Sequence, residues 1–306
     1  MYKRILVPLD GSQLATNALH PALALAKANE GIIVLLRVPV YQKQLLPEKV
    51  AAVYNRLRPP EEKEWVQQRM QRYLRSVRQL TLGQEISLET LVIDGEPASV
   101  IVDTAESEIV DLIVMSTHGR SGLARWWLGS VTQKVLRAAR HPVLIVRSDK
   151  VPAGMLITLD GSATAEAALE PARQIALSLG IPLSLLRVLE PLDTTDIDQT
   201  LPDNEVEQLM QQLAEARQEE AVAYLEQVKA SLQVPDEIVV DTAVLVGPPA
   251  DIILDFAQSN KIDLIAMSSH GQSAEARWAY GSVTEKVIHR ADQAVLVVRP
   301  QPANAN

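Results

Sequence analysis

The sequence predicts two tandem α/β domains, each built on a parallel β-sheet with helices on both faces. Its 306 residues exceed what one core usually holds, because cores rarely grow past roughly 250–300 residues before they split. Hydrophobic residues make up 47% of the chain but aromatic residues only 4%. The cores must therefore be aliphatic, as is typical of strands covered by helices on both faces.

An internal repeat fixes the domain organisation. Four blocks recur in the same order, the first two 150 positions later and the last two 152 positions later. Such self-similarity is the sequence signature of a repeated structural unit. We therefore predict domains over residues 1–148 and 153–300, with the junction near Ser148–Gly154. The blocks and their copies are Ile5–Ser12 and Leu156–Ser162, Leu35–Val38 and Leu185–Val188, Asp111–Gly119 and Asp263–Gly271, and Gly129–Thr132 and Gly281–Thr284.

Strand and helix patterns alternate within each half, which favours parallel strands joined by helical crossovers. Pro21 and its copy Pro171 fall inside the first helix of each half, where proline is expected to kink the helix. In the first half we expect strands at Arg4–Leu9, Ile32–Val38, Ser87–Val92, Leu112–Met115 and Pro142–Val146. The expected helices are Ser12–Asn29, Pro59–Gln79, Pro97–Glu108 and Val131–Ala139, and in the second half Asn204–Leu232.

Composition excludes several classes of function. The formal net charge of −9 disfavours nucleic acid as a partner, because phosphate backbones require a basic surface. The chain has no cysteine, so disulfides and thiolate metal sites are excluded. It has no apolar run near the ~18 residues of a membrane span, and its start lacks the apolar segment of a signal peptide. We expect a soluble, cytoplasmic protein without membrane contact.

The ends of the first and fourth strands are the expected ligand site. In open parallel sheets, ligands bind beyond the carboxyl ends of the strands where the strand order reverses. The first strand ends at Pro8-Leu9-Asp10 and the fourth at Met115-Ser116. The copies of these segments are Thr158-Leu159-Asp160 and Met267-Ser268, so two candidate sites are expected.

The loop after the fourth strand is the richest motif. Ser116, Thr117, His118 and Gly119 precede a nine-residue spacer and then Gly129-Ser130, where a helix begins. Helix N-termini offer unpaired amide groups and a partial positive charge to an anion, whereas the alternative is that Ser130 is an ordinary N-cap and the glycines only make turns. The second copy has Ser268, His270, Gly271, Gly281 and Ser282 at these positions.

These residues resemble the phosphate-binding motif of the universal stress proteins: Gly, two residues, Gly, nine residues, then Gly followed by Ser or Thr. The spacing and the final Gly-Ser match in both halves, but Ser116 and Ser268 replace the first glycine. The resemblance implies five-stranded sheets of order 3-2-1-4-5, an adenine-nucleotide alpha hydrolase-like fold, and binding of ATP, with Mg²⁺ as its usual companion. It also implies phosphate contacts near Met115, Ser116, His118, Gly119, Gly129, Ser130, Val131 and Thr132, and near Met267, Ser268, His270, Gly271, Gly281, Ser282, Val283 and Thr284.

The same resemblance gives Asp10 and Asp160 a ribose contact and Val38 and Val188 an adenine contact. An Asx-turn or N-cap role is the alternative for the aspartates, and a core strand end is the alternative for the valines. The two sites are not expected to be equivalent. Pro8 and Leu9 align with Thr158 and Leu159. Arg120 aligns with Gln272, so a phosphate contact from this position is expected in the first site only.

We interpret His118 and His270 as hydrogen-bonded loop residues rather than catalysts, and we assign no catalytic residue. The predicted function is that of a tandem universal stress protein that binds ATP and acts in stress adaptation as a nucleotide-dependent switch or interaction protein. The alternatives are a stress-related interaction protein without nucleotide and a slow ATP hydrolase. Protein partners are not identifiable from the sequence. The last strands, Val143–Val146 and Ala294–Val298, are expected to pair in an intrachain pseudo-dimer or a homodimer.

Overall fold

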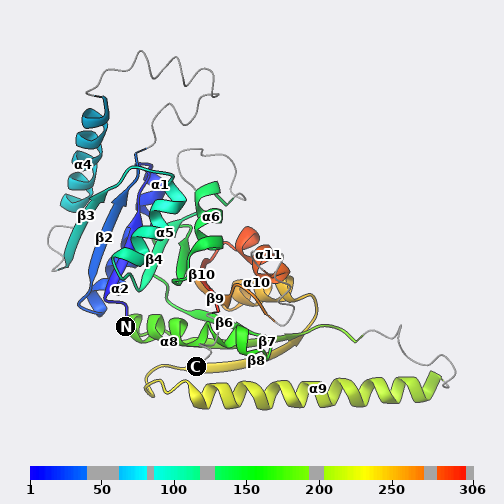
Figure 1. Cartoon of the computed structure of the whole chain (residues 1–306). Helices are drawn as coiled ribbons and strands as arrows, with labels where there is room; N and C mark the ends of the chain where they lie inside the picture. Colours follow the sequence, from blue (N-terminus) through cyan, green and yellow to red (C-terminus); the bar gives the residue numbers. More distant parts are fainter. Residues whose placement is uncertain (40–61, 81–85, 118–127, 193–202, 272–280, 301–306) are drawn as a thin grey trace, which may run out of the picture. The chain divides into compact units, whose positions relative to one another are not determined.

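The chain folds as two compact units, Met1–Val151 and Pro152–Asn306 (Figure 1). The computed structural model describes residues 1–39, 62–80, 86–117, 128–192, 203–271 and 281–300. Helices and strands carry the labels of Figure 1.

The first unit is a five-stranded parallel sheet. Its strand order is β3-β2-β1-β4-β5, and every neighbouring pair in it is parallel. The predicted order 3-2-1-4-5 is therefore confirmed, with the reversal between β1 and β4. The strands are β1 Arg4–Pro8, β2 Ile32–Arg37, β3 Ser87–Val92, β4 Leu112–Ser116 and β5 Val143–Val146.

The second unit repeats this topology. Its order is β8-β7-β6-β9-β10, again with parallel pairs throughout. The reversal falls between β6 and β9, at the positions that copy β1 and β4. The strands are β6 Met155–Leu159, β7 Leu183–Leu189, β8 Val240–Val246, β9 Leu264–Ser268 and β10 Ala294–Val298.

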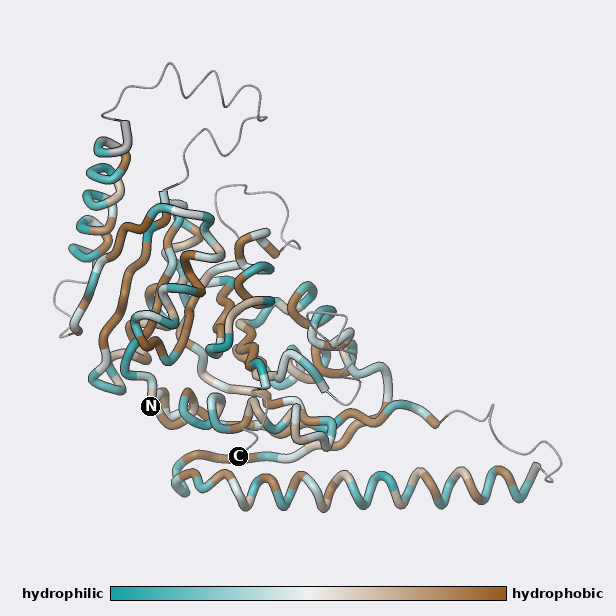
Figure 2. Tube along the Cα trace, viewed as in Figure 1, coloured by the Kyte–Doolittle hydropathy of each residue, from teal (hydrophilic) through white to brown (hydrophobic). Residues whose placement is uncertain are grey.

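Helices cover the sheets and close two aliphatic cores. In the first unit α2 packs on β1 and β2, α4 packs on β2 and β3, and α5 packs beside α6. The central strands are buried, and their brown colour in Figure 2 shows that they are hydrophobic. Their side chains are mainly the predicted Ile, Leu and Val. The helices are α1 Gln13–Thr16, α2 Leu19–Ala28, α4 Glu62–Leu80, α5 Pro97–Ser107, α6 Ser130–Ala138, α7 Ala163–Glu166, α8 Leu169–Leu179, α9 Asp203–Ser231, α10 Pro249–Ser259 and α11 Ser282–Arg290.

The first helix of each unit is interrupted rather than kinked at its proline, so that prediction is wrong. The break comes before the proline, between α1 and α2 and again between α7 and α8. Pro21 and Pro171 then stand in the first turn of α2 and α8. Their missing amide costs nothing there, because first-turn amides have no partner within the helix.

The remaining boundaries agree with the predicted ones to within one or two residues, with one exception. The predicted start of the second helix at Pro59 lies outside the described residues, and α4 is described from Glu62. Among the helices that the structure describes, none combines the length and the apolar character that a membrane crossing requires.

Candidate functional site

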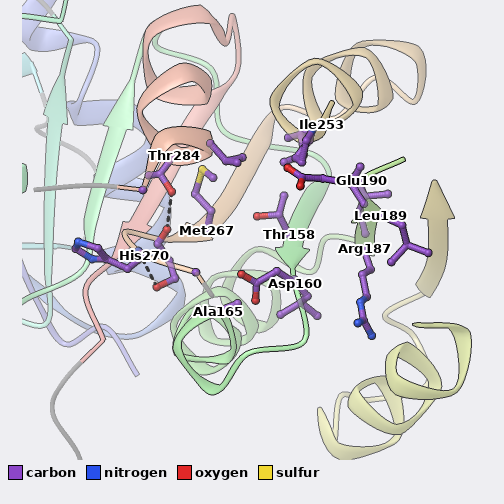
Figure 3. Close-up of a pocket in the computed structure, with 18 of the residues that line it drawn as sticks. Thr158, Asp160, Ala165, Arg187, Leu189, Glu190, Ile253, Met267, His270 and Thr284 are labelled. Atoms are coloured by element: carbon purple, nitrogen blue, oxygen red, sulfur yellow. Dashed lines mark hydrogen bonds between the residues drawn. The ribbon is translucent and has the colours of Figure 1, made fainter. Parts of the chain in front are cut away.

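A cavity of about 390 Å³ lies in the second unit, at the carboxyl ends of its strands. It opens where β6 and β9 diverge, the position predicted for a ligand from the order reversal. Figure 3 shows Thr158 and Asp160 at the end of β6, between Met267 and His270 on the β9 side and Arg187 on the β7 side. The wall consists of Thr158–Asp160, Ala165, Leu186–Glu190, Arg217, Glu220, Pro249, Ile253, Met267, Ser268, His270, Gly271 and Gly281–Thr284.

Asp160 is held at the cavity by the turn that follows β6. Its Oδ1 accepts hydrogen bonds from the Ser162 amide at 2.9 Å and from the Ser162 hydroxyl at 2.5 Å, and Ser162 in turn caps α7. Asp10 and Ser12 repeat this arrangement at 2.9 and 2.6 Å. The Asx-turn that was the alternative role of these aspartates is therefore present in both units, and it uses the Oδ1 atom of each carboxylate.

The loops after β6 and β9 meet, as the topology predicted. Gly271 follows β9 and lies so close to Asp160 that a Cβ atom on it would overlap the Oδ2 atom of the carboxylate. The Thr164 hydroxyl also donates to the Gly271 carbonyl at 3.2 Å. Glycine at this position therefore lets the backbone approach the aspartate and closes one side of the cavity.

The N-terminus of α11 forms another side of the cavity. Its N-cap is Gly281, whose amide donates to the Ser269 carbonyl at 2.8 Å. The hydroxyl of the buried Thr284 donates to the Ser268 carbonyl at 2.9 Å, which ties the first turn of α11 to the end of β9. Ser282 and Val283 then line the cavity with the first turn of the helix, where the partial positive charge of a helix is located.

The first unit copies this anchor. The Gly129 amide donates to Thr117 at 2.7 Å, and the Thr132 hydroxyl donates to Ser116 at 3.2 Å. The N-cap of α6 is Gly129 and not Ser130. The alternative that Ser130 caps this helix is therefore wrong, and the same holds for Ser282 at α11.

His270 lines the cavity and is hydrogen-bonded within its own loop. Its Nδ1 atom lies 2.9 Å from the Ser269 hydroxyl, in agreement with the interpretation of a structural loop residue. The counterpart residues His118, Gly119 and Arg120 lie outside the described residues. The nine-residue spacers lie largely outside them as well, so the Arg120 contact stays a prediction.

Sequence reasoning missed the arginine at the end of the second strand. Arg187 lines the cavity and is buried, and its guanidinium forms a bidentate ion pair with Glu220 of α9 at 3.0 and 3.1 Å. It also lies 5.1 Å from the centre of the Tyr224 ring, within range of a cation–π contact. The repeated Leu-Leu-Arg-Val block was the signal for it, because a charged residue in a buried strand requires partners.

Arg37 is the counterpart in the first unit and is also buried. Its Nη1 donates to the Leu9 carbonyl at 2.7 Å, its Nε lies 2.9 Å from the Met70 sulfur, and its guanidinium lies 5.8 Å from the Tyr73 ring centre. In both units an arginine therefore lies between the turn after the first strand and the long helix.

The long helix α9 is attached to the cavity wall at two further points. Arg217 donates to the Glu190 carbonyl at 3.3 Å, and the Tyr224 hydroxyl donates to Glu166 of α7 at 3.0 Å. Burial, and then the hydrogen bond to Glu166, raise the pKa of Tyr224 well above its ordinary value. Tyr224 therefore stays protonated and remains a hydrogen-bond donor to α7 across the physiological pH range.

The fold and the cavity define a class of protein: a tandem, doubly wound α/β protein with a cavity at the strand-order reversal of its second unit. The family model described as "Universal stress protein family" matches residues 1–147 and 155–299. The chain therefore belongs to the universal stress protein family, with two copies of its domain.

Individual relatives agree with this assignment. Universal stress protein MJ0531 of Methanocaldococcus jannaschii is 31% identical over 156 residues, which is 49% of this chain and 85% of that protein. Universal stress protein Mb2028c of Mycobacterium bovis is 25% identical over 221 residues, 70% of each chain. The crystal structure of a universal stress protein from Archaeoglobus fulgidus superposes with a TM-score of 0.67 at 23% identity, covering 97% of this chain and 96% of that one, so it supports the fold.

Proposed function

We propose that this tandem universal stress protein binds ATP at the strand-order reversal of each unit and acts in stress adaptation as a nucleotide-dependent switch. One observation carries the proposal: the cavity of the second unit has a carboxylate on one wall and a helix N-terminus on another. A carboxylate oxygen suits sugar hydroxyls, and helix amides suit phosphate. A nucleotide carries both groups at its two ends.

The residues of the cavity fit this ligand by chemistry. The amides at the start of α11, near Gly281–Val283, would take the phosphates, with Mg²⁺ accompanying them from solution. The Asp160 carboxylate lies on the cavity wall, and it would accept hydrogen bonds from the ribose hydroxyls. Val188, on the β7 side of the cavity, would contact the base through its backbone. The corresponding proposal for the first unit uses Asp10, Val38, Gly129 and Ser130.

Nucleotide in the cavity of the second unit could affect helix α9 through direct contacts. Three contacts, Arg187–Glu220, Arg217–Glu190 and Tyr224–Glu166, join α9 to segments that line or flank the cavity. A ligand that shifts these segments changes the position or the stability of α9, which is how binding biases one conformation over another. Hydrogen exchange in α9 that does not respond to ATP would argue against a switch at this helix.

Gly281 offers a sharp test of nucleotide binding. Its φ is −64°, and a Cβ atom there meets neighbours only at ordinary distances, of which 3.8 Å to Ser269 is the shortest. Asp and Asn are both favoured N-caps, so Gly281→Asp and Gly281→Asn should fold equally well. They differ by one negative charge at the phosphate position.

We expect Gly281→Asp to weaken ATP binding at least about tenfold more than Gly281→Asn, because a fixed carboxylate repels phosphate. Isothermal titration calorimetry of the full chain, with Gly129→Asp present to disable the first site, measures the effect on the second site. No heat and no retention at millimolar ATP in the unmodified chain would favour an interaction protein without nucleotide. Phosphate release that requires Gly281 would favour a slow hydrolase.

The pairing of the two halves through their last strands, in an intrachain pseudo-dimer or a homodimer, stays a prediction.

A further inference from the structure

The elements around the cavity of the second unit set the order in which a nucleotide would lie across it. The N-terminus of α11 and the end of β9 border one side, β6 with Asp160 lies in the middle, and β7 borders the other side. A nucleotide carries phosphate, ribose and base in that same order. With the phosphates at α11 and the ribose at Asp160, as in the proposed function on which this inference rests, the base lies on the β7 side (Figure 3).

The β7 side of the cavity has apolar walls that suit the faces of a base. Leu189 at the end of β7 and Ile253 of α10 are buried and line the cavity, and Pro249 lines it from the first turn of α10. Small-molecule sites typically combine such apolar walls with a few polar groups that give specificity. The polar groups on this side therefore decide which base edge fits.

Two polar side chains on this side differ from their counterparts in the first unit. Thr158 and Pro8 occupy the same register position in β6 and β1. Glu190 follows β7, and the offset of 150 residues aligns it with Val40, which lies outside the described residues. The sequence of the first unit therefore has an apolar residue at each of these two positions.

Both side chains project into the cavity. Figure 3 shows the Thr158 hydroxyl directed toward Met267, and it shows the Glu190 carboxylate directed toward Ile253. Arg217 holds the Glu190 backbone through the carbonyl oxygen at 3.3 Å. Within the part of the chain that the structure describes, neither the hydroxyl nor the carboxylate has a hydrogen-bond partner. A carboxylate only accepts hydrogen bonds, whereas a hydroxyl also donates, so the pair suits a base edge that carries an N–H donor.

We propose that Thr158 and Glu190 make the second site selective for a base with an amino group at this edge, whereas the first site lacks this selection. Adenine presents its 6-amino group as a donor, and hypoxanthine presents a 6-oxo acceptor at the same position. The Glu190 carboxylate accepts from the amino group but meets the oxo group as a second acceptor. The Thr158 hydroxyl donates to a ring nitrogen of the base.

The binding of ATP and of inosine triphosphate to the full chain tests the proposal. Gly129→Asp is present to disable the first site, and isothermal titration calorimetry gives the two dissociation constants of the second. We expect ATP to bind at least about tenfold more tightly, the effect of one hydrogen bond to a charged group. Glu190→Gln should weaken ATP binding and strengthen inosine triphosphate binding, because an amide donates as well as accepts.

Matched variants separate the polar groups from the shape of the site. Thr158→Val removes the hydroxyl but keeps a β-branched side chain, so ATP binding should weaken about threefold to tenfold. Thr158→Ser keeps the hydroxyl and should bind ATP like the unmodified chain. Glu237→Gln makes the same charge change at an exposed position outside the cavity wall and should leave both dissociation constants unchanged. Thermal melts should show that all variants are folded.

The outcomes distinguish this inference from the nucleotide site itself. Equal affinities of the second site for the two nucleotides, or equal losses for both in Glu190→Gln, would overturn the selection and leave ATP binding in place. With Gly281→Asp in place of Gly129→Asp, the first site should bind the two nucleotides within about threefold of each other, and a preference as strong as that of the second site would also overturn the proposal. If the second site binds neither nucleotide, the inference and the proposed function fail together.

Discussion

Replacing Gly161 by alanine tests whether Arg187 is a fixed part of the cavity wall. Gly161 has a φ of +87°, and an added Cβ would lie 3.1 Å from Nη2 and 3.2 Å from Cζ of Arg187. The guanidinium is held by Glu220 and Tyr224, so it has little freedom to move aside. The substitution therefore adds two costs, left-handed backbone strain and displacement of the arginine.

Gly180→Ala is the matched control for backbone strain. Gly180 has a φ of +64°, and an added Cβ there meets nothing within 4 Å. A non-glycine residue in the left-handed region costs about 1–2 kcal/mol, and both variants incur this cost. Loss of the ion-pair geometry at the partly exposed Glu220 adds about 1 kcal/mol at Gly161 alone.

We therefore expect the second-unit transition of Gly161→Ala to melt about 2–4 °C below that of Gly180→Ala, the shift that ~1 kcal/mol gives in a domain of this size. Differential scanning calorimetry of the full chain measures both transitions. Equal melting temperatures would refute the idea that the arginine is fixed. The idea also fails if Gly161→Ala costs as much with Arg187→Leu as without it, because contacting residues should be coupled.

Three further predictions concern stability. Thr284→Val removes the buried hydrogen bond to the Ser268 carbonyl and should destabilise the second unit by about 1–2 kcal/mol; urea unfolding checks this, and an unchanged midpoint contradicts it. Burial lowers the pKa of His141 below its ordinary value of 6.5, so the unfolded state binds the proton first and the first unit loses stability as the pH falls below 6.5. His141→Gln, which installs the residue found at the aligned position Gln293, should reduce this loss in thermal melts between pH 7 and 5. The hydrogen bond from Lys134, and then that from the Ser99 amide, lower the pKa of Glu96. The unmodified chain should therefore be slightly more stable than Glu96→Gln at pH 7. Thermal melts should show this difference in stability disappear as the pH falls through the lowered pKa.

The sequence was sufficient for the fold because its evidence is local and repeated. Strands such as the one that contains Ile32–Leu36 are continuous aliphatic runs over most of their length, and the intervening segments have helical periodicity, so each element is specified by its own residues. The repeat then supplied every element a second time. The effect of Pro21 was predicted wrongly, because the helix is interrupted between α1 and α2, before the proline. Hydrophobic periodicity does not report where such a break falls.

Part of the candidate site was also predictable from the sequence. The strand-end rule placed Asp160 beside the loop after β9, and the contact between Asp160 and Gly271 agrees with it. The alternative that Ser130 caps the helix was wrong, because the N-cap is the adjacent Gly129. Sequence alone does not say which of two neighbouring residues leaves the helical conformation.

By itself, the sequence determined that this chain contains two copies of one doubly wound domain, because aliphatic strands, helical periods and glycine positions are properties of short segments. Only the tertiary structure decided how the cavity wall is built. Arg187 meets Glu220 across 33 residues of sequence, and Asp160 meets Gly271 across more than one hundred. Such contacts depend on where the crossovers return the chain in space, and no local pattern encodes that distance.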